Sequence, residues 1–172
     1  KLACKEGYEV LIVSSDKDLM QLVQPGVTMY DPMKNRHIGE AEVIEKFGVV
    51  PKKVIDVQSL AGDSADNIPG VPGIGIKTAS QLIKEYDNLD ELLERAEEIR
   101  QPKRREKLVE FAENARLSRK LVTLRDDLVL DQNISDFAFR EPNTEELLLF
   151  FEEMEFNNRA RKLRAKIQNL SD

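Results

Sequence analysis

The segment from Ile68 to Ala79 constrains the fold more than any other part of the chain, and it reads IPGVPGIGIKTA. Three glycines and two prolines between Pro69 and Gly75 predict a tight turn, because glycine adopts positive φ angles and lets the backbone approach closely. An amphipathic helix is predicted directly behind the turn, and a helix ending near Asn67 is expected before it. The segment therefore predicts a helix-hairpin-helix. The apolar face of the second helix would be formed by Ala79, Leu82, Ile83 and Tyr86.

The glycine-rich turn also has the features of a phosphate-binding hairpin. Backbone N–H groups at a helix N-terminus favour a phosphate, Lys77 adds a positive charge, and Ile74 can anchor the turn in the core. Contacts of this kind hold a DNA backbone without reading its sequence. A purely structural turn between two helices is the alternative. The candidate DNA-binding residues are Gly73, Ile74, Gly75, Lys77 and Thr78.

The chain before this hairpin is typical of an α/β protein, and most of the rest is helical. The apolar run Tyr8–Ser14 is expected to form a strand buried on both faces of a parallel sheet. Val27–Tyr30 and Arg36–Ile38 are further strand candidates, and Asn143 is a candidate N-cap of the last clear helix. We expect an α/β fold in which the edge of a mostly parallel sheet is followed by a helical subdomain. The expected division is 1–50 for the α/β core, 51–156 for the helical region with the helix-hairpin-helix at about 55–86, and 157–172 for a charged tail or linker.

Two pairs of aspartates are candidate metal ligands and candidate catalytic residues. Asp16 and Asp18 follow the first predicted strand, where functional groups gather in open α/β sheets. Asp63 and Asp66 are three residues apart, so on a helical turn they would share one face. Like charges this close repel unless a cation lies between them. Each pair could instead be a set of turn or helix-capping residues.

The remaining composition narrows the chemistry. His37 and Cys4 are the single histidine and cysteine of the chain. The chain therefore has too few of these residues for a typical zinc site, and a Ser–His or Cys–His catalytic pair is poorly supported. Mg²⁺ and Mn²⁺ prefer oxygen ligands. If the chain is catalytic, a metal ion bound by carboxylates is the mechanism that its composition still allows. No small-molecule cofactor is predicted.

The charge pattern is compatible with an anionic partner. The net charge is −6, but Arg100–Arg125 has nine bases and three acids, and Arg159–Lys166 has five bases and no acid. Solvated helix faces explain such runs equally simply. No apolar run is long enough for a membrane span, and the lone Cys4 suits a cytosolic protein. Because the chain starts with Lys1 and a strand follows almost at once, we expect that the start of the protein is missing.

Two segments resemble the 5′ nuclease domain of bacterial DNA polymerase I, in the flap endonuclease superfamily. They read VLIVSSDKDLMQLV and VIDVQSLAGDSADNIPGVPGIGIKTASQLIKEY, and the later LSRKLVTLRDDL and FFEEMEF fit the same domain. The resemblance covers about Lys1 to Phe156. It implies a 5′ nuclease fold and Mg²⁺- or Mn²⁺-dependent hydrolysis of phosphodiesters at 5′ ends or flaps of DNA during replication and repair, in the bacterial cytoplasm.

The same resemblance implies roles for the candidate residues. The matching aspartates would mainly build the second metal site of a two-metal centre, and they are Asp16, Asp18, Asp63 and Asp66. Gly73, Gly75 and Lys77 would hold the duplex, with K⁺ bound at the hairpin in many family members. The family's amino-terminal part, with further acidic ligands and the arch that threads the flap, has no counterpart here. We therefore expect poor or no cleavage by this chain alone.

Two other functions remain open at this point. One is a non-catalytic helix-hairpin-helix module that binds duplex DNA, and the other is a structural interaction domain with capped helices. Four aspartates close to a bound phosphate would repel it unless metal intervenes, which argues against the simple binding module.

Overall fold

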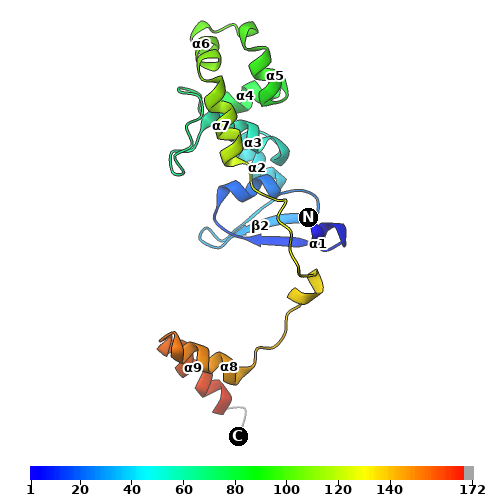
Figure 1. The fold of residues 1–172 in the computed structure, drawn as a ribbon, viewed down its shortest axis with the longest axis vertical. Helices are drawn as coiled ribbons and strands as arrows, with labels where there is room; N and C mark the ends of the chain where they lie inside the picture. The colour runs from blue at the N-terminus through cyan, green and yellow to red at the C-terminus, as the bar shows by residue number, and fades with distance from the viewer. Residues whose placement is uncertain (169–172) are drawn as a thin grey trace. The chain divides into compact units, whose positions relative to one another are not determined.

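The computed structural model describes residues 1–168, and these fall into two compact units (Figure 1). The first unit is Lys1–Val129, and the second begins at Leu130. None of the helices in the described part of the chain is long and apolar enough to cross a lipid bilayer.

The first unit begins with a short helix, α1 (Leu2–Lys5), and a three-stranded sheet. The strands are β1 (Val10–Val13), β2 (Val27–Asp31) and β3 (Arg36–Ile38), in the spatial order β1-β2-β3. β1 pairs with β2 in parallel, and β2 pairs with β3 as an antiparallel hairpin. The hairpin predicted between Val27–Tyr30 and Arg36–Ile38 is present as β2 and β3. Together with the parallel pair β1–β2, it forms the small sheet that the sequence predicted before the helical region.

The expectation that the first strand is buried on both faces is wrong for this chain. The side chains of Leu11 and Val13 are 51% and 61% exposed, whereas Ile12 packs against the core. β1 is one of the two edge strands of the described sheet, and its side chains alternate between the two faces of the sheet. One face packs on the helices through residues such as Met29 of β2, and the other faces outward.

Helices make up most of the rest of this unit. The apolar face predicted for the helix behind the glycine-rich turn is confirmed: Ala79, Leu82, Ile83 and Tyr86 are all buried. Leu108 and Ala115 are also buried, on two helices that meet at Phe111. The elements are α2 (Glu40–Phe47), η2 (Pro51–Lys53), α3 (Val54–Ala61), α4 (Ile76–Tyr86), α5 (Leu89–Glu94), η3 (Ala96–Glu98), α6 (Pro102–Glu110) and α7 (Ala112–Val122).

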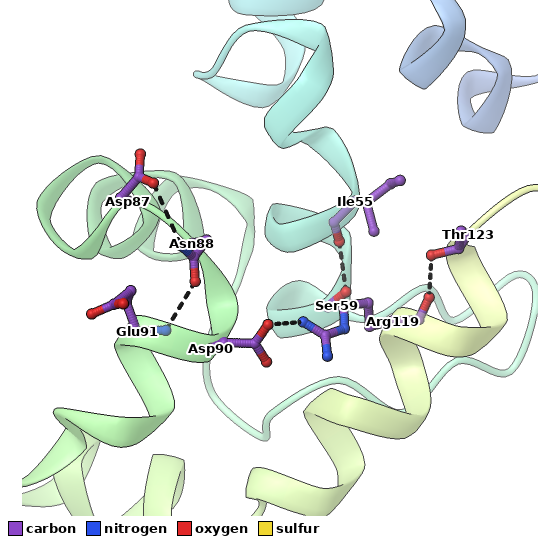
Figure 2. A network of polar contacts seen from close by, with 8 residues as sticks. All are labelled: Ile55, Ser59, Asp87, Asn88, Asp90, Glu91, Arg119 and Thr123. Atoms are coloured by element: carbon purple, nitrogen blue, oxygen red, sulfur yellow. Dashed lines mark hydrogen bonds and ion pairs between the residues drawn. The ribbon is translucent and has the colours of Figure 1, made fainter.

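Polar contacts on α3, α5 and α7 lie close together (Figure 2). Arg119 of α7 donates a hydrogen bond of 2.7 Å to Asp90 of α5, and Asn88 caps α5 by accepting from the Glu91 N–H. On α3, the Ser59 hydroxyl donates to the Ile55 carbonyl at 2.6 Å. The Arg119–Asp90 contact joins α7 to α5, and α3, which leads directly into the candidate site, packs against both of these helices.

The second unit is a pair of helices preceded by a short 3₁₀ turn, η4 (Ile134–Phe137). The Asn143 side chain accepts from the Glu145 and Glu146 N–H groups at the start of α8 (Thr144–Glu153), which confirms the predicted N-cap. The expected charged tail from 157 is instead helical over α9 (Asn157–Gln168), and residues 169–172 of it lie outside the described residues. The helix forms because apolar residues recur at helical spacing and pack towards α8, namely Ala160, Leu163 and Ile167.

Candidate metal centre and nucleic-acid interface

The loop that follows β1 carries the first aspartate pair. It leads into a 3₁₀ helix, η1 (Lys17–Leu22), whose N-cap is Asp16. The Asp16 carboxylate accepts a hydrogen bond of 2.9 Å from the Asp18 N–H. This contact leaves Asp16 exposed and turns the Asp18 side chain away from it, towards α3, where it meets Gln58. Asp16 therefore occupies the capping role that sequence reasoning left open.

The second aspartate pair lies on a turn after α3, not on a helix that continues to Asn67. α3 ends at Ala61 because Gly62 adopts a positive φ of 69°. Asp63 and Ile68 then exchange two backbone hydrogen bonds of 2.8 and 2.9 Å, which close a tight turn. The carboxylates of Asp63 and Asp66 still reach the same point, because the turn folds back on itself.

The structure brings three of the four predicted aspartates together. One carboxylate oxygen each from Asp18, Asp63 and Asp66 lies within 4.8 Å of the others. Asp18 comes from the first turn of η1, shortly after the carboxyl end of β1, and the other two come from the turn after α3. We call these three residues the acid cluster. Asp63 is buried, Asp18 is half-buried and Asp66 is exposed, so the cluster is open to solvent on one side.

Lys17 supplies the positive charge that faces this cluster. Its ammonium group forms an ion pair with Asp63 Oδ2, and the Lys17 side chain is 35% exposed. The contact lowers the pKa of the Asp63 carboxyl below its ordinary value, and it raises the pKa of the Lys17 ammonium. Asp18 and Asp66 also contribute to the raised pKa of Lys17 through their charges. Sequence reasoning did not single out Lys17.

Gln58 is a second residue that sequence reasoning missed. It is 3% exposed, and its amide donates a hydrogen bond of 2.6 Å to Asp18 Oδ1. The signal for it is the spacing in α3, because position 58 lies on the apolar stripe of positions 54, 57 and 61, and the whole run 57–60 is buried. A polar side chain on such a stripe needs a polar partner, and Asp18 is that partner.

Gln21 fixes the far end of the same loop. Its amide nitrogen donates to the Val122 carbonyl at 3.0 Å, and its oxygen accepts from the Leu124 N–H at 3.2 Å. The loop is thus held by α3 on one side and by the end of α7 on the other. Two restraints on one short loop give Asp18 a defined position relative to Asp63.

The acid cluster has the chemistry of a site for a hard divalent cation. All three donors are carboxylate oxygens, which Mg²⁺ and Mn²⁺ prefer, and the open side leaves room for water or a phosphate. Two buried oxygens at the site, Gln58 Oε1 and Asp63 Oδ2, have no hydrogen-bond partner among the described residues; the contact of Asp63 Oδ2 is its ion pair with Lys17. The residues present therefore fit such an ion.

The loop between α3 and α4, residues 62–75, carries both Asp63 and the predicted hairpin tip. We call it the interhelical loop, and Figure 1 shows it extending from the helical part of the first unit. It is held at its base by Gly62 and Gly70, since a Cβ on Gly70 would meet Gly62 Cα at 2.7 Å. The Gly70 N–H also donates to the buried Ser118 hydroxyl at 2.9 Å.

The tip of this loop has an open backbone surface. Gly73 has a φ of 83°, and a Cβ at Gly73 or at Gly75 would meet nothing within 4 Å. Ile74 is buried as predicted, with its N–H donating to the Val71 carbonyl at 3.0 Å. Gly75 is the N-cap of α4, and Lys77 in the first turn is exposed. Thr78 follows in the same turn and is half-buried.

Family sequence models account for most of the chain. Residues 49–145 match the 5′-3′ exonuclease C-terminal SAM fold, and residues 1–48 match the 5′-3′ exonuclease N-terminal resolvase-like domain. The chain belongs to the 5′-3′ exonuclease family. The acid cluster of this 5′-3′ exonuclease chain draws Asp18 from the first matched region and Asp63 and Asp66 from the second.

Curated relatives of this family are longer than the chain. It is 54% identical over 157 residues to the DNA polymerase I of Rhizobium leguminosarum, a match that covers 91% of the chain and 16% of that protein. It is 36% identical over 154 residues to a 5′-3′ exonuclease of Aquifex aeolicus, which covers 90% of the chain and 52% of the relative. The chain thus spans about half or less of these relatives.

A solved structure shares the fold. The bacteriophage T5 D15 flap endonuclease, in a pseudo-enzyme-product complex with DNA and metal ions, superposes with a TM-score of 0.65. The match covers 70% of this chain and 45% of that protein, at 24% sequence identity. The α/β fold of the 5′ nucleases predicted from the sequence is confirmed.

Proposed function

We propose that this chain forms the carboxy-terminal part of a divalent-metal-dependent 5′ nuclease, which hydrolyses phosphodiester bonds at 5′ ends or flaps of DNA in replication and repair. One observation carries the proposal. The interhelical loop holds two carboxylates of the acid cluster at its base and an exposed, glycine-rich tip beyond them. A cation site and a phosphate-binding surface therefore lie on one short segment in a member of the 5′-3′ exonuclease family.

The chain's residues divide into two roles in this proposal. Asp18, Asp63 and Asp66 would hold Mg²⁺ or Mn²⁺, which when bound supplies Lewis-acid activation of water and of the scissile phosphate. Gln58 orients Asp18, Lys17 neutralises Asp63 while no metal is bound, and the backbone around Gly73 and Gly75 receives the DNA backbone. Lys77 adds a positive charge beside it.

The names of the relatives support the proposal without deciding it. The relatives are a DNA polymerase I, a 5′-3′ exonuclease and a flap endonuclease crystallised with DNA and metal ions. A DNA polymerase I is accordingly the proposed parent protein, and the bacterial cytoplasm is the proposed setting. A 5′-flap or nicked duplex is the proposed substrate.

Asp16 caps η1 and is not one of the three aspartates of the acid cluster, so its place in the proposed metal centre needs a test of its own. Asparagine caps a helix about as well as aspartate, so Asp16→Asn keeps the cap and removes one negative charge. A fall in Mn²⁺ affinity in this variant would assign Asp16 to the site. An unchanged affinity would restrict Asp16 to capping η1.

K⁺ at the hairpin is a further part of the proposal. A hydrogen bond from the Ile74 N–H to the Val71 carbonyl closes a turn beside the open glycine surface, and the backbone oxygens of such a turn suit a monovalent cation shared with a phosphate. Duplex affinity measured at one ionic strength should be higher in KCl than in tetramethylammonium chloride. Equal affinities would remove K⁺ from the proposal.

A non-catalytic module that binds duplex DNA is the second candidate. It explains the loop tip but not the acid cluster, because three carboxylates near a phosphate repel it. The two candidates differ in how divalent metal affects DNA binding. If the chain is part of a nuclease, divalent metal should strengthen its binding to DNA near the acid cluster. If it is a simple binding module, divalent metal should leave DNA binding unchanged or weaken it by screening the charges.

The test is binding of a labelled 5′-flap duplex with and without Mg²⁺, by the wild type, Asp63→Asn and Lys77→Glu. We expect Mg²⁺ to strengthen binding by the wild type. Asp63→Asn should bind better than the wild type without metal, because one repulsive charge is gone, and should lose the Mg²⁺ effect. Lys77→Glu should bind weakly in both conditions. A metal effect that survives Asp63→Asn would contradict the nuclease proposal.

A cleavage assay on the same substrate completes the test. We expect little or no cleavage by this chain alone in Mg²⁺ or Mn²⁺, since further acidic ligands are expected from the amino-terminal part of the family. Robust cleavage that disappears in Asp63→Asn would mean that the acid cluster suffices for a working site. That result would support the nuclease and overturn our expectation about the missing ligands.

A further inference from the structure

A hollow of about 560 Å³ lies between the tip of the interhelical loop and α6. The loop contributes backbone and apolar side chains, and α6 contributes mostly charged ones. We call this space the α6 hollow. Its lining residues are Pro72, Gly73, Ile74, Gln101, Lys103, Arg104, Glu106 and Lys107.

The two walls of the α6 hollow suit the same ligand. On one side, Gly73 has a positive φ and no neighbour at its Cβ position, so a backbone-sized ligand can approach closely. On the other side are Lys103, Arg104 and Lys107, opposed by a single acid, Glu106. Lys103 and Lys107 are four residues apart on α6 and share one face.

Neighbouring interactions leave this positive charge largely available. Arg104 donates 2.7 Å to the neutral Gln101 side chain, which orients the guanidinium without neutralising it. Lys107 pairs with Glu110 at 2.8 Å, and this pair is close to half exposed, so an anion can compete for the ammonium. Lys103 is exposed at the rim.

The excess of positive charge in the α6 hollow does not extend into an adjacent hollow. That space, of about 460 Å³, shares Gln101 and Arg104 with the α6 hollow. It also contains Glu85 and Glu98, which balance Arg100 and Arg104. A phosphate is therefore favoured in the α6 hollow and not beside it, in a chain whose net charge is −6.

We propose that the α6 hollow binds a second stretch of the DNA phosphodiester backbone, next to the stretch held by the loop tip. This inference rests on the proposed function, because the loop tip must first receive DNA. Lys103, Arg104 and Lys107 are the residues that contact phosphate. They carry no sequence information, and they extend the footprint of the loop along the duplex.

The experiment is the salt dependence of duplex binding by the full chain. The slope of log affinity against log salt falls by about 0.9 for each phosphate that the protein no longer neutralises. Lys103→Ala/Lys107→Ala should reduce the slope by about 2 and weaken binding. Lys52→Ala/Lys84→Ala is the matched control, because it removes two exposed lysines away from the α6 hollow and should leave the slope unchanged.

A variant that makes the α6 hollow more positive distinguishes direct DNA contact from a structural effect, because it should strengthen DNA binding instead of weakening it. Glu106→Gln removes the one acid of the α6 hollow, so duplex binding should become tighter, whereas Glu85→Gln should have no effect. Thermal unfolding checks that all variants remain folded. If Lys103→Ala/Lys107→Ala matches its control while Lys77→Glu loses binding, this inference alone is overturned. A wild type that binds no duplex overturns the proposed function as well.

Discussion

Lys17 forms an ion pair with Asp63 of the acid cluster, so the chain's own ammonium group neutralises a carboxylate that is expected to bind a divalent cation. The lysine and a metal ion compete for the Asp63 carboxylate. The pair stabilises the metal-free protein by neutralising one of three crowded carboxylates. It must open when metal binds.

Lys17→Met should therefore change stability and metal affinity in opposite directions. Without metal the variant should be less stable by about 1–3 kcal/mol, between the values for exposed and buried ion pairs. Its Mn²⁺ affinity should rise about tenfold, because a unit positive charge no longer competes. Urea unfolding and titration calorimetry measure the two effects, with Lys52→Met as the control. A weaker Mn²⁺ affinity would show that Lys17 assists binding instead of competing.

Gln58→Leu should weaken metal binding while leaving the fold intact. The substitution removes the hydrogen bond that orients Asp18, and such supporting contacts are worth about 10–100-fold in metal affinity. It also removes a buried oxygen without a partner, so stability should change little. Gln101→Leu, on the exposed surface near α6, is the control. Equal losses of stability and Mn²⁺ affinity in Gln58→Leu would mean that Gln58 acts only through the fold.

Substitution by alanine should lower the free energy of unfolding much more at Gly70 than at Gly73, although both residues have a positive φ. At Gly73 a Cβ meets open space, so Gly73→Ala should cost about 1–2 kcal/mol from backbone strain alone. At Gly70 it would overlap the backbone of Gly62 and Ala61, so Gly70→Ala should cost about 2–5 kcal/mol in total. Urea unfolding of both variants checks the difference. Equal costs would contradict the close approach of the two backbone segments.

Asp31 should make the fold sensitive to acid. Its buried carboxylate accepts from the Ser15 hydroxyl at 2.6 Å and from the Met33 and Lys34 N–H groups, and the Ser15 bond is the main cause of its lowered pKa. Because the folded pKa lies below the unfolded one, the stabilisation is present above the ordinary aspartate pKa of 3.8. It is lost as pH falls through the lowered value.

The matching measurement compares the wild type with Asp31→Asn across pH. The wild type should be more stable at neutral pH, and the gap should narrow in acid as Asp31 gains a proton. Urea midpoints between pH 7 and pH 2 give the two curves. A gap that stays constant over this range would contradict the role of the charged carboxylate.

The sequence predicted the apolar face of α4 because that face depends on local spacing. The residues that recur at helical spacing in α4 are all buried, as that spacing predicts, namely Ala79, Leu82, Ile83 and Tyr86. The end of α3 could not be placed, because it depends on Gly62 packing against Gly70, a contact between residues apart in the chain. α9 was missed because five basic residues obscured its apolar stripe.

The candidate site was predictable in its residue types and not in its geometry. Carboxylates after a strand and before a glycine-rich turn were visible in the sequence, but their meeting depends on how α3 packs beside η1. For the same reason Lys17 and Gln58 were invisible, since their roles follow from partners distant in the chain. Asp16 had two possible roles, and the structure places it at the N-cap.

The most direct test of the proposed metal centre is Mn²⁺ titration of the whole chain by calorimetry. We predict saturable binding that weakens at least tenfold in both Asp63→Asn and Asp66→Asn, with Asp127→Asn unchanged as an exposed control. Binding that is absent, or equally strong in the wild type, Asp63→Asn and Asp66→Asn, would contradict the claim that the acid cluster is a divalent metal site.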